Sequence, residues 1–575
     1  MKHVLKFIKP YLSQMLIGFF FLALTSVMTF ALPYLMSEIV DSGIKAQDMN
    51  KIYTYGATML GAALLGLIFS LIYNKISAKV GTHVTGDLRR AVFQKINALS
   101  LSEFNKKGTA EFLTRSTEDT FVLQEVVAGI GMIVVQMPIL FIGGVVLTFE
   151  RSVILSLIMF AVVPITVFIV FQIGKRVGPM YRKNSETIDA QNRILRERLT
   201  GIRVIRAFNS EDHEHERLKE ATDEMTTYII RANVLSSLIN PVSVFLFNLA
   251  TVIIMFVGAH QVGYGTDFSA GDLIAVVQYV NMIASAIMII TILLIFLPRV
   301  KVCLNRIAEV FDLQDESTIG IQDAKLNGTL ELNNVTFAYS KHGQPAIKDI
   351  NIKVDEGQTV AIIGGTGSGK STVLRLLLAF YAPTQGEIRM GGVPYSELSP
   401  SCIRQNVSVA LQKAMVFKGT IKDNVLMGKE DATEEEIKEA LRIAQLDNFV
   451  FSEGIGLDYE LNQGGANLSG GQKQRLNIAR MVVKPASVYI FDDSFSALDF
   501  LTEANLRKEL NRFLDGKTQI IITQRAATAM RCDKIYVLDD GNQVGEGTHD
   551  SLMETCDVYR EIYESQMKQG EKADA

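Results

Sequence analysis

The chain has 575 residues, which is long enough for more than one domain. It is 48% hydrophobic and 21% charged, and its apolar residues are unevenly distributed along the chain. The net charge of -4 gives no argument for a nucleic-acid partner, and four widely spaced cysteines without a CxxC pair form neither a disulfide framework nor a zinc site.

Six long stretches without a formal charge occupy the first part of the chain. Each is at least ~20 residues long, which is enough for a helix to cross ~30 Å of hydrocarbon. Because lipid satisfies no backbone polar group, helices are the expected structure. The first stretch follows three lysines but is too long for the apolar region of a signal peptide. The predicted membrane helices are residues 15–36, 53–73, 126–149, 152–174, 232–262 and 273–298.

Lysine and arginine are unequally divided among the segments that join these helices. Residues 75–125 and 175–231 carry 8 and 12 of them, whereas the loops 37–52, 150–151 and 263–272 carry three in total. Positive charge favours the cytosolic side of a membrane. We therefore expect a multi-pass protein of the plasma membrane, with both termini and the two long segments in the cytosol.

The two long cytosolic segments each have about 50 residues. Two helical arms of ~25 residues in each segment would project ~37 Å from the bilayer. Ordinary loops are the alternative, but loops of that length without structure are uncommon. We therefore predict two levers that reach a cytosolic domain.

From about Leu330 onward the composition is that of a soluble domain. Short β-rich runs such as TVAIIGG, SVYIFDD and TQIIIT alternate with charged helical stretches, for example 432–447 and 502–513. This alternation is typical of an α/β domain. The predicted fold is a multi-domain membrane protein with a six-helix all-α transmembrane domain (1–310), a linker (311–327) and an α/β nucleotide-binding domain (328–575).

The sequence GGTGSGKST follows an apolar strand, opens a helix and fits the phosphate-loop pattern G-x-x-x-x-G-K-[ST]. Its glycines allow backbone N–H groups to close around phosphates, and the helix N-terminus attracts the anion. Lys370 would reach the β- and γ-phosphates of ATP, and Ser371 would ligate Mg²⁺. The residues predicted to bind the nucleotide are Gly364, Gly365, Thr366, Gly367, Ser368, Gly369, Lys370, Ser371 and Thr372.

A second apolar strand, SVYIF, ends in Asp492, whose carboxylate is suited to hold Mg²⁺. Gln412 lies between the two motifs, and NLSGGQKQRLNIAR comes just before the second strand. Ser469 and the two glycines after it form a second phosphate-binding turn at a helix start. A glycine turn that only caps a helix is the alternative, and the position between the two nucleotide motifs argues against it.

Together these motifs resemble those of ATP-binding cassette exporters. The whole chain is similar to one half-transporter of the bacterial multidrug type, in which six helices are fused to one nucleotide-binding domain. The resemblance implies that Tyr339 stacks on adenine and that Gln412 senses Mg²⁺ and the γ-phosphate. It also implies that the segments near 100–107 and 206–215 are coupling helices, which dock on nucleotide domains. Members of this family work as dimers, in which each ATP lies between the phosphate loop of one chain and the signature turn of the other. The resemblance places Asp499 in the loop that crosses the dimer interface. The signature turn of this chain comprises Leu468, Ser469, Gly470, Gly471 and Gln472.

The chain departs from this family at residues that act on the γ-phosphate. Asp493 stands where the family has Glu as the proposed general base, and its carboxylate is one carbon–carbon bond (~1.5 Å) shorter. A misplacement near 1 Å can slow a reaction ~100-fold. Gln524 stands where the family has His, and it cannot carry a positive charge. Gln463 replaces a Glu before the signature turn.

These departures spare the binding residues Lys370, Ser371 and Asp492. We therefore predict a site that binds ATP and Mg²⁺ but hydrolyses poorly, within a heterodimer. The partner half-transporter would supply Glu and His, and this chain's signature turn would complete the partner's catalytic site. Two alternatives remain. One is a homodimeric lipid or peptide exporter with a slow Asp base. The other is an ATP-gated regulatory or channel-like membrane protein, although charge-free helices offer no selectivity ring.

The membrane helices contain only mildly polar residues, so a fixed ion pathway is not expected. Flexible methionines and aromatic side chains suit varied amphipathic ligands, although most such residues face lipid or neighbouring helices. By resemblance, the predicted cargo is a range of amphipathic or hydrophobic compounds, including drugs, taken from the cytosol or inner leaflet. Lipid or peptide export stays open. The residues concerned are Thr25, Ser26, Asn240, Asn248, Gln278, Asn281, Met282, Met288, Phe19, Phe20 and Phe21.

Overall fold

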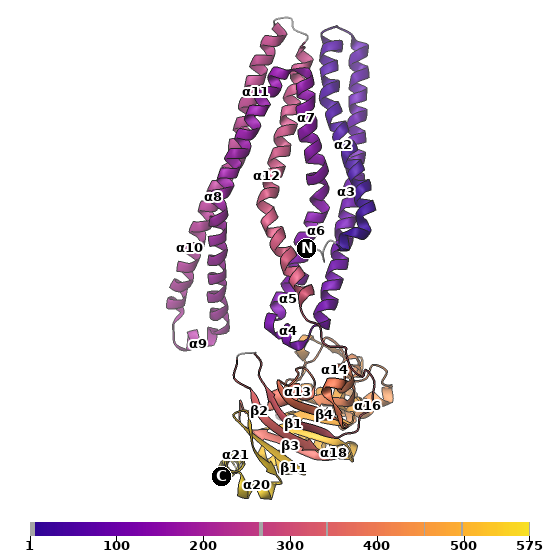
Figure 1. The fold of residues 1–575 in the computed structure, drawn as a ribbon, viewed down its shortest axis with the longest axis vertical. Helices are drawn as coiled ribbons and strands as arrows, with labels where there is room; N and C mark the ends of the chain where they lie inside the picture. The colour runs from indigo at the N-terminus through magenta and orange to yellow at the C-terminus, as the bar shows by residue number, and fades with distance from the viewer. Residues whose placement is uncertain (1–5, 264–267, 341–342, 453–454, 496–497, 574–575) are drawn as a thin grey trace. The chain divides into compact units, whose positions relative to one another are not determined.

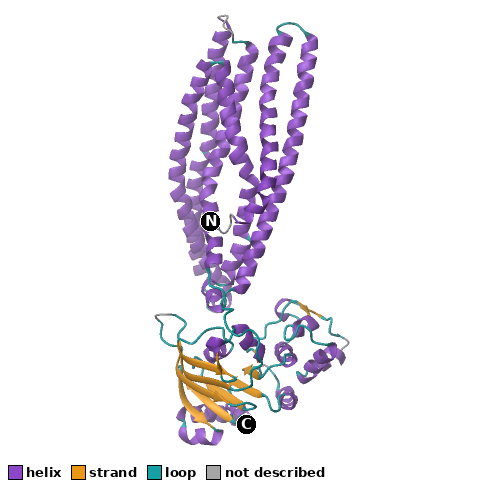
Figure 2. Cartoon of the chain, turned by 45° about the vertical axis from the view of Figure 1, so that its right-hand side comes forward, coloured by secondary structure: helices purple, strands orange, loops and turns teal. Residues whose placement is uncertain are grey.

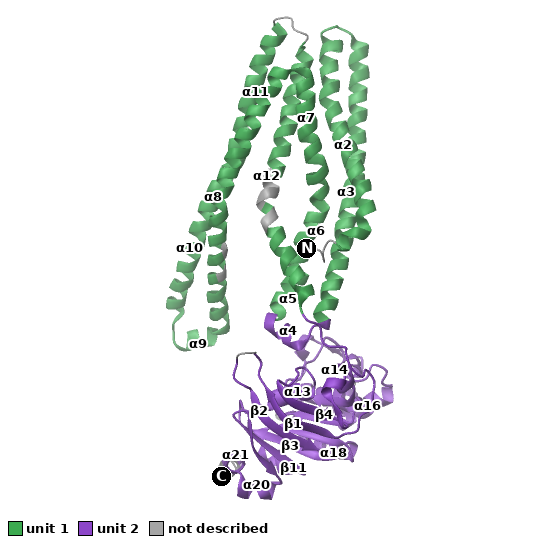
Figure 3. Ribbon diagram, viewed as in Figure 1, with its two compact units in different colours: residues 1–97, 108–313 green, residues 98–107, 314–575 purple. Residues whose placement is uncertain are grey.

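The chain folds into two compact units, each of which is built from two segments of the sequence (Figure 3). The computed structural model describes residues 6–263, 268–340, 343–452, 455–495 and 498–573. Within these residues the first unit is helical, and the strands belong to the second unit (Figure 2). The first unit comprises Met1–Asn97 and Gly108–Leu313, and the second comprises Ala98–Lys107 and Gln314–Ala575.

The first unit contains six helices that are long and apolar enough to cross a membrane, counted within the described residues (Figure 1). This confirms the six predicted spans, and several helices extend well beyond the charge-free stretches. The main elements are α2 (Leu12–Glu38), α3 (Met49–Ala98), α6 (Glu118–Gly131), η3 (Met132–Gln136), α7 (Met137–Arg151), α8 (Val153–Thr200), α10 (Glu211–Ser237), α11 (Ile239–Gly263) and α12 (Ala270–Asp312).

Helix α12 packs against both α7 and α11, and small residues permit the close approach. A Cβ atom added to Gly144 of α7 would lie 2.7 Å from the Cγ1 atom of Ile283 on α12. A Cβ atom on Gly258 of α11 would lie 2.4 Å from a methyl carbon of Leu273 on α12. Such small-residue contacts are how membrane helices associate without a hydrophobic driving force between them.

Helices α8 and α10 form one of the two predicted levers and are joined by the short helix α9 (Ile202–Ala207). Hydrogen bonds connect the pair, for example from the Nε2 atom of Gln191 to the hydroxyl of Thr222 (3.0 Å). The segment 206–215, predicted to hold a coupling helix, spans the end of α9 and the start of α10, and its coupling role stays a prediction. Asn209 adopts a left-handed conformation (φ +51°) that ends α9, and the acidic residues that follow begin α10, where a helix N-terminus favours them.

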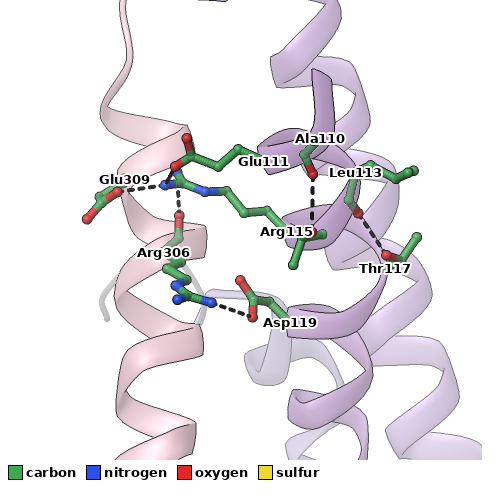
Figure 4. Close-up of polar contacts among 9 residues, drawn as sticks. Ala110, Glu111, Leu113, Arg115, Thr117, Asp119, Arg306 and Glu309 are labelled. Atoms are coloured by element: carbon green, nitrogen blue, oxygen red, sulfur yellow. Dashed lines mark hydrogen bonds and ion pairs between the residues drawn. The ribbon is translucent and has the colours of Figure 1, made fainter. Parts of the chain in front are cut away.

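A buried arginine joins α5, in the second arm of the other predicted lever, to the end of α12 (Figure 4). Arg115 of α5 (Thr109–Ser116) is 3% exposed. Its guanidinium donates to the carbonyl of Arg306 (3.0 Å) and to the carboxylate of Glu309 (2.9 Å), and it also pairs with Glu111. Arg306 in turn lies 3.9 Å from the carboxylate of Asp119. The guanidinium thus holds α5 and α12 together at several points.

The second unit is built around a ten-stranded sheet of order β5-β4-β1-β2-β12-β11-β3-β10-β9-β6. Strands β11, β3, β10, β9 and β6 pair in parallel, and β3 and β9 are apolar and buried along most of their length, as strands covered on both faces are. The bounds are β1 (Leu330–Phe337), β2 (Ile347–Val354), β3 (Thr359–Gly364), β4 (Gln385–Met390), β5 (Val393–Pro394), β6 (Val407–Ala410), β9 (Val488–Asp492), β10 (Thr518–Thr523), β11 (Lys534–Asp539) and β12 (Asn542–Gly547).

Helices pack on this sheet and enclose separate apolar clusters. One cluster lies beneath α13, a second beneath α17 and α18, and a third beneath α19, α20 and α21. A small two-stranded sheet pairs β7 (Gly419–Thr420) with β8 (Glu460–Leu461). The α-helices in the longer segment of this unit, Gln314–Ala575, are α13 (Lys370–Leu377), α14 (Pro400–Asn406), α15 (Ile421–Leu426), α16 (Glu434–Ile443), α17 (Gly470–Val483), α18 (Phe500–Phe513), α19 (Ala526–Ala529), α20 (His549–Thr555) and α21 (Asp557–Ala573).

A short helix from the first part of the chain belongs to the second unit. This is α4 (Leu101–Lys107), which covers the predicted first coupling helix. Glu316 donates its N–H to the carbonyl of Ala98 (2.8 Å), and the Nδ2 atom of Asn105 donates to the hydroxyl of Tyr381 (3.0 Å). Residues 98–107 thus group with the second unit, and the predicted domain boundaries at 310 and 327 stay predictions.

Candidate nucleotide site

The phosphate loop joins β3 to α13, and its glycines are required for two different reasons. A Cβ atom on Gly364 would lie 2.2 Å from the carbonyl oxygen of Leu538, so packing against β11 requires its small size. Gly367 and Gly369 have φ values of +87° and +98°, which residues with a Cβ rarely adopt. A Cβ atom on Gly365 or Gly367 would meet nothing within 4 Å, so these two backbones border open space that phosphates could approach.

Lys370 crosses the phosphate loop from the first turn of α13. Its Nζ atom donates to the carbonyls of Gly364 (2.7 Å) and Gly365 (2.6 Å), and the Oγ atom of Ser368 lies 3.2 Å away. The side chain is buried, and burial lowers the pKa of Lys370, while Asp493 and Asp492 act in the opposite direction. A cationic amine is thus held inside the loop, where it would neutralise phosphate oxygens.

Tyr339 lies beside this loop, just after β1, with its ring partly exposed. Its hydroxyl is 3.1 Å from the Oγ1 atom of Thr372 and accepts a hydrogen bond from Arg375 (2.8 Å). Tyr381 packs edge-on against the ring, with 5.4 Å between centroids. The Arg375 guanidinium lies 5.7 Å from the ring centroid, so a stacked base would use the other face of the ring or displace Arg375.

The remaining nucleotide motifs follow neighbouring parallel strands. In the register, Thr523 of β10 pairs with Ile363 of β3, and Ile522 pairs with Asp492 of β9. The residues that come next, including Gln524 and Asp493, therefore share one edge of the sheet with the phosphate loop. The carboxyl edge of a parallel sheet is where ligands bind in α/β folds.

Asp492 and Asp493 both lie close enough to Lys370 to influence its pKa. The pKa of Asp492 is raised, chiefly because the group is buried, and the backbone N–H of Gln412 hydrogen-bonds to its carboxylate (3.4 Å). Ser371 lies one residue after Lys370 in α13. The hydroxyl of Ser371, the side-chain oxygen of Gln412 and the Asp492 carboxylate are the hard oxygen donors that Mg²⁺ prefers, so the residue set fits this ion.

Asp493 occupies the predicted position of the general base, and its backbone is constrained. Its φ of +45° lies in the left-handed region, and its N–H donates to the carbonyl of Ile522 (2.9 Å). Burial raises the pKa of Asp493, while Arg525, a hydrogen bond with the Gln412 side chain and Lys370 lower it. The structure thus brings together Lys370, Gln412 and the two aspartates.

The signature turn begins α17, with Ser469 as its N-cap. The Oγ atom of Ser469 accepts a hydrogen bond from the N–H of Gln472 (3.2 Å), and the Gln472 side chain accepts one from the N–H of Ser469 (2.8 Å). Ser469 and Gly470 are exposed, and Leu468 packs into the apolar cluster beneath the helix. The helix start is therefore rigid and open to a ligand, while its contact with a partner's ATP stays a prediction.

Asp499 caps α18, where its carboxylate accepts a hydrogen bond from the N–H of Thr502 (2.9 Å). Hydrogen bonds from Thr502 lower the pKa of Asp499. Asp499 thus has a clear local structural role in addition to the one that the resemblance implies.

Gln524 follows β10 and is exposed, and its carbonyl accepts a hydrogen bond from Gln566 of α21 (2.7 Å).

The structure adds residues that the motifs did not indicate. Arg375 and Tyr381 contact Tyr339, the predicted adenine platform. Gln566 contacts the backbone of Gln524, and Arg525 lowers the pKa of Asp493. No pattern in the sequence marks them, because each lies outside a motif or at a position where many residue types are compatible with the local fold.

Comparison with known proteins agrees with this architecture. Residues 15–288 match the family model for the ABC transporter transmembrane region, and residues 347–496 match the model for ABC transporter. The chain is 33% identical to an uncharacterized ABC transporter ATP-binding protein of Mycobacterium tuberculosis (strain CDC 1551 / Oshkosh), over 97% of each chain. It is 31% identical to another from Bacillus subtilis (strain 168), over 98% of each chain.

A solved structure shares the fold along almost the entire length. The structure of a bacterial Atm1-family ABC exporter with ATP bound superposes with a TM-score of 0.80 at 24% sequence identity, covering 97% of this chain and 98% of that chain. The likeness shows that a six-helix membrane domain fused to a nucleotide-binding domain is the fold of this chain, as predicted.

Proposed function

This chain belongs to the ABC transporter family, and from that premise we propose that it is one subunit of a heterodimeric exporter whose own ATP site binds nucleotide but hydrolyses it slowly. The family membership itself establishes an ATP-driven, multi-pass membrane transporter with its nucleotide-binding domain in the same chain. The proposal concerns the division of work between two sites, the direction of transport and the cargo.

The observation that carries the proposal is the constrained position of Asp493. A general base must come within hydrogen-bond distance of the water that it activates. Asp is shorter than Glu by one carbon–carbon bond (~1.5 Å), and its backbone here is held by the hydrogen bond to Ile522 in a left-handed conformation. The backbone therefore has little freedom to advance and recover the lost reach. A shortfall near 1 Å can slow hydrolysis ~100-fold.

Nucleotide binding requires none of the altered residues. The loop N–H groups and Lys370 would neutralise the phosphates, and the oxygen donors of Ser371, Gln412 and Asp492 would hold Mg²⁺. When bound, Mg²⁺ offsets negative charge on the phosphate oxygens. Gln524 can donate a hydrogen bond toward a γ-phosphate but supplies no positive charge. These features support a site that retains ATP.

In the proposed cycle, ATP binding closes the nucleotide domains of the two subunits, and the levers turn the membrane cavity outward. The signature turn around Ser469 would complete the partner's site, which would carry Glu and His at the positions of Asp493 and Gln524. Hydrolysis at that site would reset the cycle. We place the chain in the plasma membrane with its termini and nucleotide-binding domain in the cytosol, as the lysine and arginine distribution indicates.

The proposed cargo is amphipathic or hydrophobic, taken from the cytosol or the inner leaflet. The membrane helices have no formally charged residues in their apolar stretches, which disfavours ions as cargo. Their exposed surface includes large apolar side chains, among them Phe20, Phe160 and Phe256. Adaptable apolar surfaces suit several ligands rather than one.

One observation favours a second candidate, a homodimer in which Asp493 is a slow but working base. Burial raises the pKa of Asp493, and a carboxylate with a higher pKa is a stronger base. This gain in basicity acts against the shorter reach. The two candidates differ in the composition of the purified complex.

The test is purification of the tagged chain from native membranes, with the associated proteins identified by mass. We expect a second half-transporter at one-to-one stoichiometry. Trapping with vanadate should then leave one ADP in each complex, and two ADP when this chain carries Asp493→Glu together with Gln524→His. A matched complex with Lys370→Ala in this chain should still trap one ADP. Recovery of this chain alone as an active ATPase would refute the heterodimer and support the homodimer.

A further inference from the structure

We propose that Gln566, on the C-terminal helix α21, is a positioning residue that fixes the backbone of residues 524–526 and thereby the place of Gln524 at the nucleotide site. The inference rests on the proposed function in one respect, namely that Gln524 faces the γ-phosphate of bound ATP. The geometry of the contact itself is independent of that role.

Both ends of the Gln566 amide are engaged with one short stretch of backbone. Its Nε2 atom donates to the carbonyl of Gln524 (2.7 Å), and its Oε1 atom accepts from the N–H of Ala526 (2.8 Å). Arg525 between them is extended, with φ −96° and ψ 114°. In an extended chain, the carbonyl of one residue and the N–H two residues later point the same way, so the amide bonds them as a neighbouring strand would.

This stretch otherwise lies between two regular elements. The pairing of β10 with β3 ends at Thr523, and α19 begins at Ala526. Neither the sheet ladder nor the helix interior provides partners for the carbonyl of Gln524 and the N–H of Ala526. Ala526 is fully buried, so its N–H requires a partner. Gln566 supplies that partner from 40 residues away, and it also donates to the carbonyl of the exposed Gln524, 42 residues away.

Helix α21 is itself firmly anchored, which makes Gln566 a precise support. Tyr559 is 0% exposed and lies 2.9 Å from the Nδ1 atom of His549 through its hydroxyl. Ile562 and Tyr563 pack against the same apolar cluster beneath the helix. Gln566 follows Tyr559 by two helical turns, so both lie on the face of α21 that meets the domain.

Residues 524–526, which Gln566 holds, include the positively charged Arg525 close to the predicted base Asp493. Arg525 lies 3.5 Å from the carboxylate of Glu503 on α18, and it is among the groups that lower the pKa of Asp493. A shift of the 524–526 backbone would therefore move Gln524 and Arg525 together, relative to Asp493. The C-terminal helix thus sets the geometry of this edge of the nucleotide site.

The test uses the assembled transporter with Gln566→Met, which keeps the length of the side chain and removes both hydrogen bonds. Gln566→Glu is a second variant, because it keeps the acceptor for Ala526 and loses the donor for Gln524. The matched control is Ser565→Ala, since among the described residues the Ser565 hydroxyl donates to the carbonyl of Ile562 in its own helix (3.0 Å). Thermal unfolding checks that each variant is folded.

Two readouts are measured, namely amide hydrogen exchange of the peptide that contains residues 524–526 and labelling of this chain by radioactive 8-azido-ATP or 8-azido-ADP. Loss of two hydrogen bonds should speed exchange in Gln566→Met by about tenfold. The concentration of 8-azido-ATP for half-maximal labelling should rise about fivefold, whereas that of 8-azido-ADP, which has no γ-phosphate, should change less than about twofold. Gln566→Glu should give intermediate exchange.

Gln524→Ala separates failure of this inference from failure of the proposed function. If Gln524→Ala weakens 8-azido-ATP labelling while Gln566→Met changes neither labelling nor exchange, Gln566 is not a positioning residue and the role of Gln524 stands. If exchange accelerates in Gln566→Met but Gln524→Ala does not alter the preference for ATP, the positioning by Gln566 is supported and the proposed role of Gln524 is wrong.

Discussion

Lys370 holds a positive charge in surroundings that disfavour it. Burial lowers its pKa from the usual 10.5. Between the folded and unfolded pKa values the unfolded chain binds more protons, so this group makes stability rise with pH there. Below that window, at neutral pH, its full penalty opposes folding. We expect Lys370→Met without nucleotide to unfold at a higher temperature than the wild-type protein near pH 7.

Differential scanning of the purified protein at several pH values measures this effect. The advantage of Lys370→Met should narrow as the pH approaches the lowered pKa of the lysine, because the wild-type side chain then loses its charge. An advantage that widens with rising pH would contradict the assignment. The same variant should lose ATP binding at its own site, so ligand-induced stabilisation provides an internal control.

Tyr339 offers a test of the predicted adenine platform. The residue is 45% exposed, and its hydroxyl contacts Thr372 and Arg375. Stacking of a base on an aromatic ring contributes about 1–3 kcal/mol, so Tyr339→Ala should weaken ATP binding by about tenfold. Tyr339→Phe keeps the ring and should change binding by less than about twofold. Titration with a fluorescent ATP analogue measures both, and an equal loss in the two variants would assign the role to the hydroxyl instead.

The residues that bind nucleotide could be predicted from the sequence, whereas the residues that hold them in position could not. Lys370 lies in a phosphate-loop pattern that follows one apolar strand, and Asp492 ends another apolar strand. The two motifs together indicate a nucleotide site. Gln566 belongs to a charged helix whose sequence gives no sign of a partner 42 residues away. Its role depends on tertiary packing, which single-sequence patterns do not record.

Among the elements, α4 offers a direct connection to the adenine platform within the second unit. Asn105 donates to the hydroxyl of Tyr381, and Tyr381 packs against Tyr339. If α4 couples nucleotide binding to the membrane helices, Tyr381→Phe should lower the ratio of ethidium-stimulated to basal ATP hydrolysis by about fivefold, the effect of one hydrogen bond of about 1 kcal/mol. ATP affinity should stay the same, because the ring contact remains.

The control for that variant is Lys106→Met on the same helix, since the ion pair of Lys106 with Glu103 lies within α4 itself. Lys106→Met should keep the wild-type ratio of stimulated to basal hydrolysis. Equal stimulation in Tyr381→Phe and wild-type protein would show that the hydrogen bond from Asn105 carries no coupling.

The Arg115 contacts predict a stability effect at the junction of α5 and α12 (Figure 4). Arg115→Met removes the guanidinium that donates to Glu309 and to the Arg306 carbonyl. The loss should destabilise the protein by about 1–3 kcal/mol and no more, because Glu309 is half-exposed and regains water. Arg115→Lys should not restore the loss, since one ammonium cannot span the same acceptors. Thermal unfolding in detergent measures the change.

The matched control for Arg115 is Arg90→Met. The Arg90 side chain is 73% exposed, and its ion pair with Asp87 lies within α3. Exposed pairs of this kind contribute little, so the unfolding temperature should not change. Equal changes in unfolding temperature for Arg115→Met and Arg90→Met would mean that the buried guanidinium stabilises the protein no more than an exposed one does.

The membrane helices could be predicted from their long apolar stretches. The residues at which the helices begin and end could be predicted less accurately. The six spans follow from the absence of charge in each stretch. Between α9 and α10, Asn209 has a left-handed backbone that separates the end of α9 from the acidic residues at the start of α10. One residue in an unusual conformation can thus set where a helix ends, which composition alone places only approximately.

For the molecule as a whole, the order of motifs along the chain predicted a membrane domain followed by a nucleotide-binding domain. The resemblance implied that residues 100–107 dock on a nucleotide domain, and α4 does belong to the second unit. Its partner Tyr381 was not predictable, because the contact joins residues 276 positions apart. Helical periodicity cannot distinguish a helix that continues its own bundle from one that docks on another unit. Only the fold separates the two.

The proposed division of labour makes an asymmetric prediction for the assembled transporter. In this chain, Gly471→Asp places a carboxylate in the first turn of α17, a position that helix N-termini favour, so the fold should persist. The same charge would repel the triphosphate held by the partner. Because the partner's site is the proposed site of hydrolysis, ATPase activity of the complex should fall by about 100-fold or more, as when a catalytic site loses its electrostatic complement. Lys370→Ala in this chain disables the slow site alone, so steady-state ATPase activity should retain a substantial fraction of the wild-type rate. A homodimer has two equivalent sites, and there both variants would abolish activity alike. Steady-state assays of the two single variants, made in this chain only, therefore distinguish the two assemblies without any knowledge of the cargo.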